Sequence, residues 1–159
     1  MKKTFKFFFS RSKWFSDWTS FKKNPYHPLV SILGSPNFGE GVYIGAFSEV
    51  NAKDSEVIIG PYCDIASFVS INCADSHKVA LEFSTKIDRR SIILEDHVFV
   101  GSHCVIKGGV KLGHHSVVAA GTIVDSCDVP PYSLIAGNPM VVKPGYYLLQ
   151  DRKPELDSP

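Results

Sequence analysis

The stretch VFVGSHCVIKGGVKLGHHSVVAAGTIV, residues 98–124, carries a repeat of six residues. Apolar residues return at every sixth position, and the same register occurs in two segments upstream. These positions are Leu94, Val100, Ile106, Leu112, Val118 and Val124, with Phe38, Ile44 and Val50, and Ile59, Ile65 and Ile71. A period of six fits neither the 3.6-residue repeat of an α-helix nor the two-residue alternation of a free-standing strand.

A short strand followed by a corner, repeated many times, does fit this period. Three such sides close a triangular coil, and stacked coils pair as parallel strands about 4.8 Å apart. The apolar positions then form an inner column that no single coil can bury alone. The sequence therefore predicts an all-β parallel β-helix with coils at 38–55, 59–76, 94–111 and 112–129. A β-sandwich would show turns every 8–12 residues without a fixed six-residue register.

The repeat is interrupted between His77 and Ile93. Residues 77–93 are predicted to leave the coil at a corner as an inserted loop, and Glu56 to Ile58 form a smaller insertion. The larger insertion carries four basic and two acidic side chains, a net charge of +2.

The composition is that of one soluble globular domain. The chain has 159 residues, of which 44% are hydrophobic and 21% charged. A net charge of +1 gives no field that would favour nucleic acid. The apolar part of the opening MKKTFKFFFS is too short for a signal peptide, so we expect a cytoplasmic protein.

The cysteines are predicted to be reduced and not catalytic. None of the four forms a CxxC pair, which argues against a structural zinc site. Cys63 and Cys104 fall on inward repeat positions, where a thiol acts as a small apolar filler.

The two ends of the chain lie outside the repeat. Residues 1–29 form a segment rich in aromatic and basic side chains, in which Trp14, Trp18 and Phe21 share one face of a helix. The favoured interpretation is a cap on the first coil, and the other is contact with a membrane surface through residues 1–27. Residues 146–159 are expected to form a tail.

Residues 98–124, followed by DVPPYSLIAGNPM at 128–140, resemble the hexapeptide-repeat acyltransferases of the sugar and nucleotide-sugar acetyltransferase type. The resemblance covers about residues 30–145. It implies a left-handed β-helix, a homotrimer with active sites between neighbouring subunits, and acetyl-CoA as co-substrate. It also implies that the loop 77–93 covers the acceptor site. The net charge of +2 on this loop either favours a phosphorylated acceptor or is ordinary solvated charge.

Acyl transfer needs a base to take a proton from the acceptor, and histidine is suited to this at neutral pH. The segment Ala74 to Lys78 resembles the sugar O-acetyltransferase segment in which a histidine before the loop is the base, although Lys78 replaces the family's proline. His77 is therefore the predicted base. Asp75 either orients its imidazole or caps the corner.

The other histidines remain alternatives. His103 and His115 are the next candidates for the base, and His97, His103 and His115 are all expected at corners, facing outward. His97 and His115 should stack on adjacent coils. No two histidines are five residues apart, the spacing of zinc ligands in carbonic anhydrases of this fold, so no metal site is expected.

The resemblance implies a site for acetyl-CoA on the last coils. Small corner residues there let a pantetheine arm approach the backbone, and residues of the terminal motif lie near its nucleotide end. The predicted cofactor-binding residues are Gly101, Ser102, Ala119, Ala120, Pro139 and Lys143. Each also fits an ordinary turn residue.

These features predict an acetyl-CoA-dependent acetyltransferase acting on a sugar. The favoured acceptor is the amino group of a nucleotide-linked amino sugar used for bacterial surface polysaccharide. A sugar O-acetyltransferase of the maltose or galactoside type is the alternative, and a non-catalytic β-helix scaffold is a third interpretation.

Overall fold

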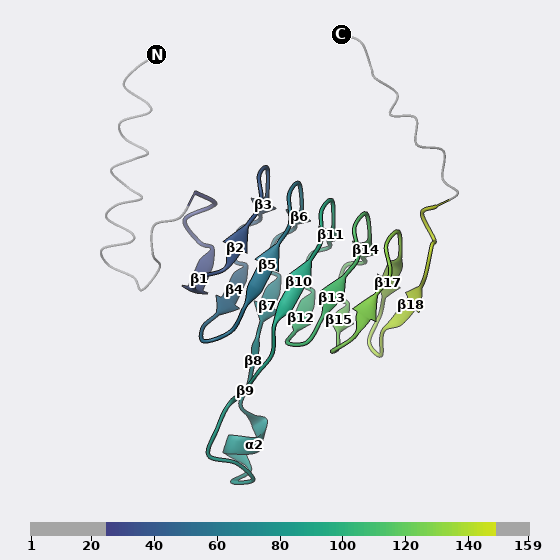
Figure 1. Cartoon of the computed structure of the whole chain (residues 1–159). Helices are drawn as coiled ribbons and strands as arrows, with labels where there is room; N and C mark the ends of the chain where they lie inside the picture. The colour runs from purple at the N-terminus through teal and green to yellow at the C-terminus, as the bar shows by residue number, and fades with distance from the viewer. Residues whose placement is uncertain (1–24, 149–159) are drawn as a thin grey trace, which may run out of the picture.

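A computed structural model describes residues 25–148 and shows a left-handed parallel β-helix (Figure 1). Three sheets form the sides of the prism. The first side consists of β1 (Ser31–Gly34), β4 (Glu49–Ala52), β7 (Ser70–Asn72), β12 (Val105–Lys107) and β15 (Ile123–Val124). The second consists of β2 (Asn37–Phe38), β5 (Val57–Ile59), β10 (Ile92–Leu94), β13 (Lys111–Leu112) and β16 (Asp128–Val129). The third consists of β3 (Tyr43–Ile44), β6 (Asp64–Ile65), β11 (Phe99–Val100), β14 (Val117–Val118), β17 (Leu134–Ala136) and β18 (Val141–Lys143).

The predicted register is confirmed by the strand pairing. Val50 lies beside Ile71, and Ile71 lies beside Ile106, so both insertions leave the stacking intact. Eleven of the twelve predicted column positions, all except Phe38, are at most 1% exposed. Burying an aliphatic side chain of this kind contributes about 1.5–3 kcal/mol, which makes this column the core of the fold.

Polar side chains that enter the interior are paired. The Ser48 hydroxyl donates to the carbonyl of Ala66 at 3.0 Å, and Thr122 donates to the carbonyl of Ala119 at 2.6 Å. Buried hydroxyls cost free energy unless they are bonded, so these contacts explain why serine and threonine are tolerated on inward positions. Cys63 and Cys104 are buried there as predicted.

The corners carry stacked rings. His97, His103 and His115 all adopt positive φ, between 54° and 61°. The rings of His97 and His115 stack with centroids 4.7 Å apart, which confirms the predicted contact between adjacent coils. A left-handed conformation costs a non-glycine residue about 1–2 kcal/mol, and ring stacking worth about 0.5–1.5 kcal/mol offsets part of that cost.

The last predicted coil is one residue too long. Val129 pairs with Leu112 and therefore opens a further turn instead of closing the coil 112–129. The inward positions Val124 and Val129 are five residues apart, because the corner between them is one residue shorter. After β17 the chain folds back, and β18 pairs with it antiparallel.

The large insertion forms a short arm whose bounds differ from the predicted 77–93, because β8 begins at Ala74 and β10 begins at Ile92. Strands β8 (Ala74–Asp75) and β9 (Asp88–Arg89) pair antiparallel at its base. The four-residue helix α2 (His77–Ala80) follows β8, and the arm projects from the prism (Figure 1). The chain rejoins the coil at Ile92, which is fully buried.

The predictions for the ends of the chain fall mostly outside the described residues. Within them, Tyr26 packs edge-on against Phe38 at the first coil, with ring centroids 5.3 Å apart. In the described part of the chain, no helix has the length and apolar character needed to cross a membrane.

Candidate functional site

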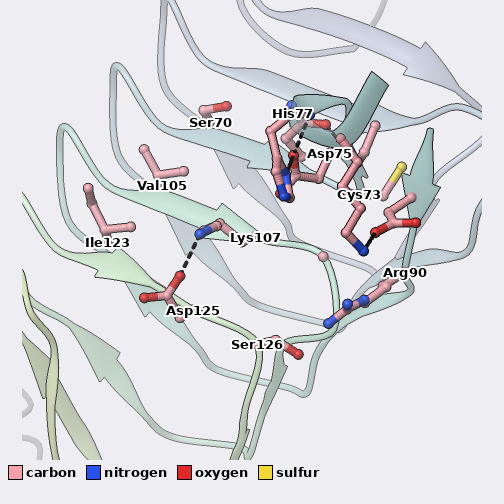
Figure 2. A pocket seen from close by; sticks show the side chains of 15 residues that line it. Ser70, Cys73, Asp75, His77, Arg90, Val105, Lys107, Ile123, Asp125 and Ser126 are labelled. Atoms are coloured by element: carbon pink, nitrogen blue, oxygen red, sulfur yellow. Dashed lines mark hydrogen bonds and ion pairs between the residues drawn. The ribbon is translucent and has the colours of Figure 1, made fainter. Parts of the chain in front are cut away.

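A pocket of about 740 Å³ lies between the arm and one side of the prism, where it is lined by residues of β7, β12 and β15 (Figure 2). The arm contributes Asp75, His77 and Lys78, and the coils contribute Lys107 and Asp125. The pocket is therefore lined by both the insertion and the coils, and His77 lies between these two parts in the sequence.

His77 and Asp75 form a hydrogen-bonded pair on the wall of this pocket. The Nδ1 atom of His77 lies 2.6 Å from Oδ1 of Asp75, which also accepts the backbone N–H of His77 at 3.1 Å. Because a carboxylate only accepts, Nδ1 carries the hydrogen and Nε2 of a neutral imidazole is the basic atom. The Asp75 carboxylate thus contacts both the ring and the backbone of His77, and its catalytic role stays a prediction.

The electrostatics of the pair keep Asp75 ionised. The hydrogen bond from His77 lowers the pKa of the Asp75 carboxyl below its usual value. Both side chains are about half exposed, 58% for His77 and 49% for Asp75. The imidazole is thus oriented by a carboxylate and open to a substrate, the arrangement that a general base requires.

Two ion pairs complete the charged lining. Lys78 bonds Asp88 at 2.7 Å across the arm, and Lys107 bonds Asp125 at 2.6 Å between adjacent coils. These bonds lower the pKa of Asp88 and raise the pKa of Lys107. Sequence analysis did not single out Lys107 or Asp125 as site residues. Both follow a column position directly and are 18 residues apart, so the coil length contained the signal.

Four predicted cofactor residues meet at a different corner. A Cβ atom on Gly101 would lie 2.6 Å from the backbone nitrogen of Ala120, and the Gly121 N–H donates to the carbonyl of Ser102 at 2.9 Å. Ser102 and Ala120 therefore lie on adjacent coils with very little space between the backbones. This corner precedes β12 and β15, which line the His77 pocket from their first residues, Val105 and Ile123, but none of the four cofactor residues lines the pocket itself.

The two remaining cofactor residues lie near the end of the described chain. Pro139 is exposed in the turn before β18, and Lys143 is exposed on that strand. The Nζ atom of Lys143 lies 5.8 Å from the ring centroid of Tyr146. Their role toward the nucleotide end of acetyl-CoA stays a prediction.

The alternative bases lie away from the pocket. His103 stacks on Phe68, with centroids 4.9 Å apart, at the corner that precedes β12. His115 belongs to another corner, where it contacts His97 and His114. Neither lines the pocket formed by the arm.

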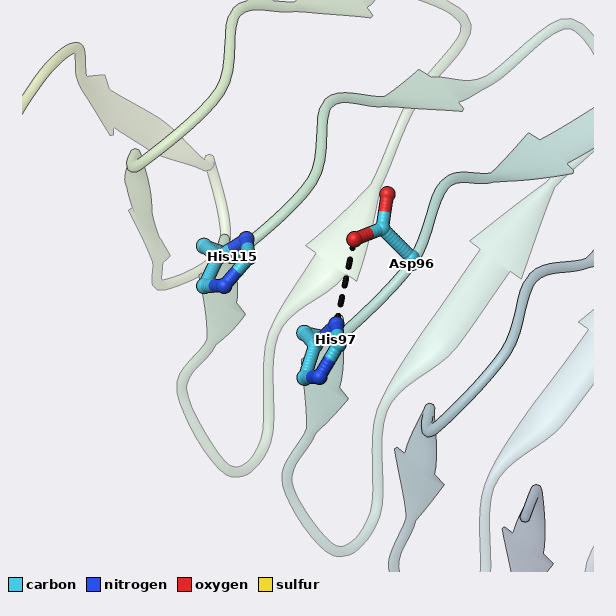
Figure 3. A group of neighbouring side chains, drawn as sticks. All are labelled: Asp96, His97 and His115. Carbon is cyan, nitrogen blue, oxygen red and sulfur yellow. Dashed lines mark hydrogen bonds and ion pairs between the residues drawn. The ribbon is translucent and has the colours of Figure 1, made fainter. Parts of the chain in front are cut away.

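Asp96, His97 and His115 form a cluster that the spacing rule did not anticipate (Figure 3). One ligand atom from each lies within 4.8 Å of the others, because stacking brings neighbouring coils together. Asp96 bonds Nδ1 of His97 at 3.1 Å, and the two imidazoles are nearly parallel at 13°. The nitrogen lone pairs of an imidazole lie in the ring plane, so two nearly parallel rings direct them along parallel planes, a geometry that fits ring stacking better than binding of one ion.

The chain is similar to several known proteins. Residues 91–126 match the family described as the hexapeptide repeat of succinyl-transferase. The galactoside O-acetyltransferase of Escherichia coli K12 is 32% identical over 132 residues, which cover 75% of this chain and 64% of that protein. The galactoside O-acetyltransferase of Lactococcus lactis is 27% identical over 120 residues, covering 73% of this chain and 56% of that protein.

Solved structures show the same likeness. The polySia specific acetyltransferase NeuO has a TM-score of 0.67 and 30% identity, covering 80% of this chain and 62% of that one. A hexapeptide-repeat containing acetyltransferase from Vibrio cholerae, complexed with acetyl coenzyme A, has a TM-score of 0.52 and 25% identity, covering 71% and 68%.

The chain thus spans about 56–64% of the galactoside O-acetyltransferases that it matches. The repeat, the three-sided coil and these relatives agree: over about three quarters of its length the chain is similar to the hexapeptide-repeat acyltransferases.

Proposed function

We propose that this protein is an acetyltransferase that moves the acetyl group of acetyl-CoA to a hydroxyl of a saccharide. The observation that carries the proposal is the His77–Asp75 pair, bonded at 2.6 Å on the wall of a pocket large enough for a sugar. The relatives named galactoside O-acetyltransferase support this class of acceptor.

In the proposed reaction, Nε2 of His77 takes the proton of the acceptor hydroxyl as its oxygen attacks the acetyl carbonyl. Acetyl-CoA supplies an activated thioester, so the C–S bond breaks as the new ester forms. The protonated His77 then returns its proton to the departing thiolate. Asp75 stabilises the imidazolium and keeps Nδ1 protonated throughout. No covalent enzyme intermediate is needed.

The proposed place of acetyl-CoA is the corner of Gly101, Ser102, Ala119 and Ala120. The small side chains at this corner would let an extended amide chain approach the backbone closely. Because this corner lies outside the His77 pocket, we propose that a homotrimer assembles the complete site, with one copy supplying the corner and its neighbour supplying the arm.

An amine acceptor is the second candidate. The 2,3,4,5-tetrahydropyridine-2,6-dicarboxylate N-acetyltransferase of Staphylococcus aureus is 42% identical over 65 residues, 41% of this chain. The same dyad can take a proton from an amine, and a nucleotide-linked amino sugar would be the acceptor predicted from the sequence. The longer alignments are with O-acetyltransferases, which supports a hydroxyl acceptor over an amine.

The test is release of CoA thiol from acetyl-CoA by the full chain, with galactosides, maltose and nucleotide-linked amino sugars as acceptors. Mass spectrometry of the product, before and after mild alkali, distinguishes an ester from an amide. We expect an alkali-labile acetylated saccharide. An alkali-stable product would favour the amine, and a protein that neither binds acetyl-CoA nor releases thiol would be a scaffold.

A further inference from the structure

We propose that Arg90 binds an anionic group of the acceptor, so that the pocket selects a negatively charged saccharide. This inference rests on the proposed acetyltransferase function and adds the chemical class of its acceptor. Arg90 lines the same pocket as His77 but enters it from the segment that leads back to the coil (Figure 2).

The backbone holds Arg90 in place. Its N–H donates to the carbonyl of Cys73 at 3.0 Å, and Cys73 is buried. The stem of the side chain lies along a glycine corner, because a Cβ on Gly108 would meet Cβ of Arg90 at 3.2 Å and one on Gly109 would meet Cδ at 3.3 Å. The two glycines thus leave the space that the arginine stem occupies, and the guanidinium starts from a defined position.

The pocket leaves this guanidinium without a counter-charge of its own. Its three carboxylates are bonded to other groups: Asp75 to His77, Asp88 to Lys78, and Asp125 to Lys107. Among residues 25–148, the Arg90 side chain has no hydrogen-bond or ion-pair partner, and it acts on Asp88 only at longer range. Because the carboxylates of the pocket are already paired, the guanidinium of Arg90 is available to bind a ligand.

The chemistry of the ligand follows from the donor. A guanidinium presents a planar fork that matches a carboxylate or a phosphate with two parallel hydrogen bonds. Acetyl-CoA also carries phosphates, but none of its six predicted residues lines this pocket. The anion is therefore assigned to the acceptor, which would occupy the pocket that His77 and Arg90 both line.

The experiment compares matched acceptors that differ in charge. Galacturonic acid, its methyl ester and galactose 6-phosphate are assayed with wild type, Arg90→Gln, Arg90→Lys and Lys86→Gln. Lys86 is an exposed cation of the same arm that does not line the pocket, so its variant controls for net charge. Circular dichroism checks that each variant is folded.

We expect wild type to prefer one of the anionic sugars over the ester by roughly tenfold or more in kcat/KM, the range of a charge-assisted hydrogen bond. Which anion is preferred distinguishes a carboxylate from a phosphate. Arg90→Gln should lose this preference and keep its KM for acetyl-CoA, Arg90→Lys should keep part of it, and Lys86→Gln should keep all of it.

Equal kcat/KM for charged and neutral sugars would overturn the inference and leave the acetyltransferase proposal intact. A raised KM for acetyl-CoA in Arg90→Gln would also overturn it, by assigning Arg90 to a phosphate of the co-substrate. Calorimetric binding of the same sugars without acetyl-CoA gives a readout independent of turnover. If no saccharide is acetylated, the proposed function fails, and binding of the anionic sugars that depends on Arg90 still decides the role of the arginine.

Discussion

The Nδ1 atom of His77 and Oδ1 of Asp75 lie 2.6 Å apart, although the two residues belong to different elements. Asp75 ends β8, and His77 begins α2. The turn between them lets one carboxylate bond both the backbone and the ring of His77. The arm therefore fixes the direction of an imidazole on the wall of the pocket.

Asp75→Asn should lower kcat by about tenfold or more, less than loss of the base itself. The amide cannot stabilise an imidazolium as a carboxylate does, and its NH₂ group can force the wrong tautomer on His77. Steady-state kinetics checks this, with KM for acetyl-CoA expected to stay the same. Asp64→Asn, an exposed change on β6 outside the pocket, is the matched control. Equal kcat in wild type and Asp75→Asn would remove Asp75 from the mechanism.

The pKa of Asp75 gives a prediction about pH. The hydrogen bond from His77 lowers the pKa of Asp75, so the carboxylate stays ionised at a pH where a free Asp, with a pKa of about 3.9, is already protonated. For a group with a lowered pKa, the interaction is present above the unfolded value and is lost as pH falls through the folded value. Carbon-13 NMR of the Asp75 carboxyl should give a midpoint below that of a free Asp, and His77→Ala should move it upward. Identical midpoints in the two proteins would contradict the bond.

The inner column should dominate stability. Ile71→Ala removes a side chain that is fully buried and should cost about 2–5 kcal/mol in the free energy of unfolding. Ile87→Ala makes the same chemical change on the arm, where the side chain is 44% exposed, and should cost much less. Urea unfolding compares them. Equal losses would mean that the column is not the core.

The cysteines should be protected in the native protein. Burial raises the pKa of the Cys63 thiol to about 11, and the reactive form of a thiol is the thiolate. At pH 8 a thiol reagent should therefore label Cys63, Cys73 and Cys104 only after unfolding, and half-buried Cys127 faster than these three. Because the pKa of Cys63 is raised, its contribution to stability is lost as the pH rises toward that value. Rapid labelling of native Cys63 would contradict its inward position.

Much of the fold was predictable because a single period determines it. The alignment of Ile71, Ile106 and Val124 on adjacent coils follows from one rule, that each side of a coil buries one aliphatic residue. Handedness does not follow from that rule, since spacing is the same in a mirror image. The five-residue spacing between Val124 and Val129 was not predicted, because a corner that is one residue shorter still leaves both side chains pointing inward.

The site was less predictable than the coil. The place of His77 at the start of the insertion pointed to the pocket, and the local spacing allowed its bond to Asp75. The role of Arg90 depends on the path of the returning chain and on backbone pairing with Cys73, which side-chain patterns do not encode. Residues of the arm have no repeat, so their positions follow only from the folded structure.

The central claim is that His77 is the base, and its direct test is the single-turnover rate of acetyl transfer in His77→Ala. The rate should fall by roughly 10²–10⁴-fold while acetyl-CoA still binds. His103→Ala, which removes an exposed histidine outside the pocket, is the matched control and should react at the wild-type rate. An unchanged rate in His77→Ala, or an equal loss in His103→Ala or His115→Ala, would contradict this assignment of the base.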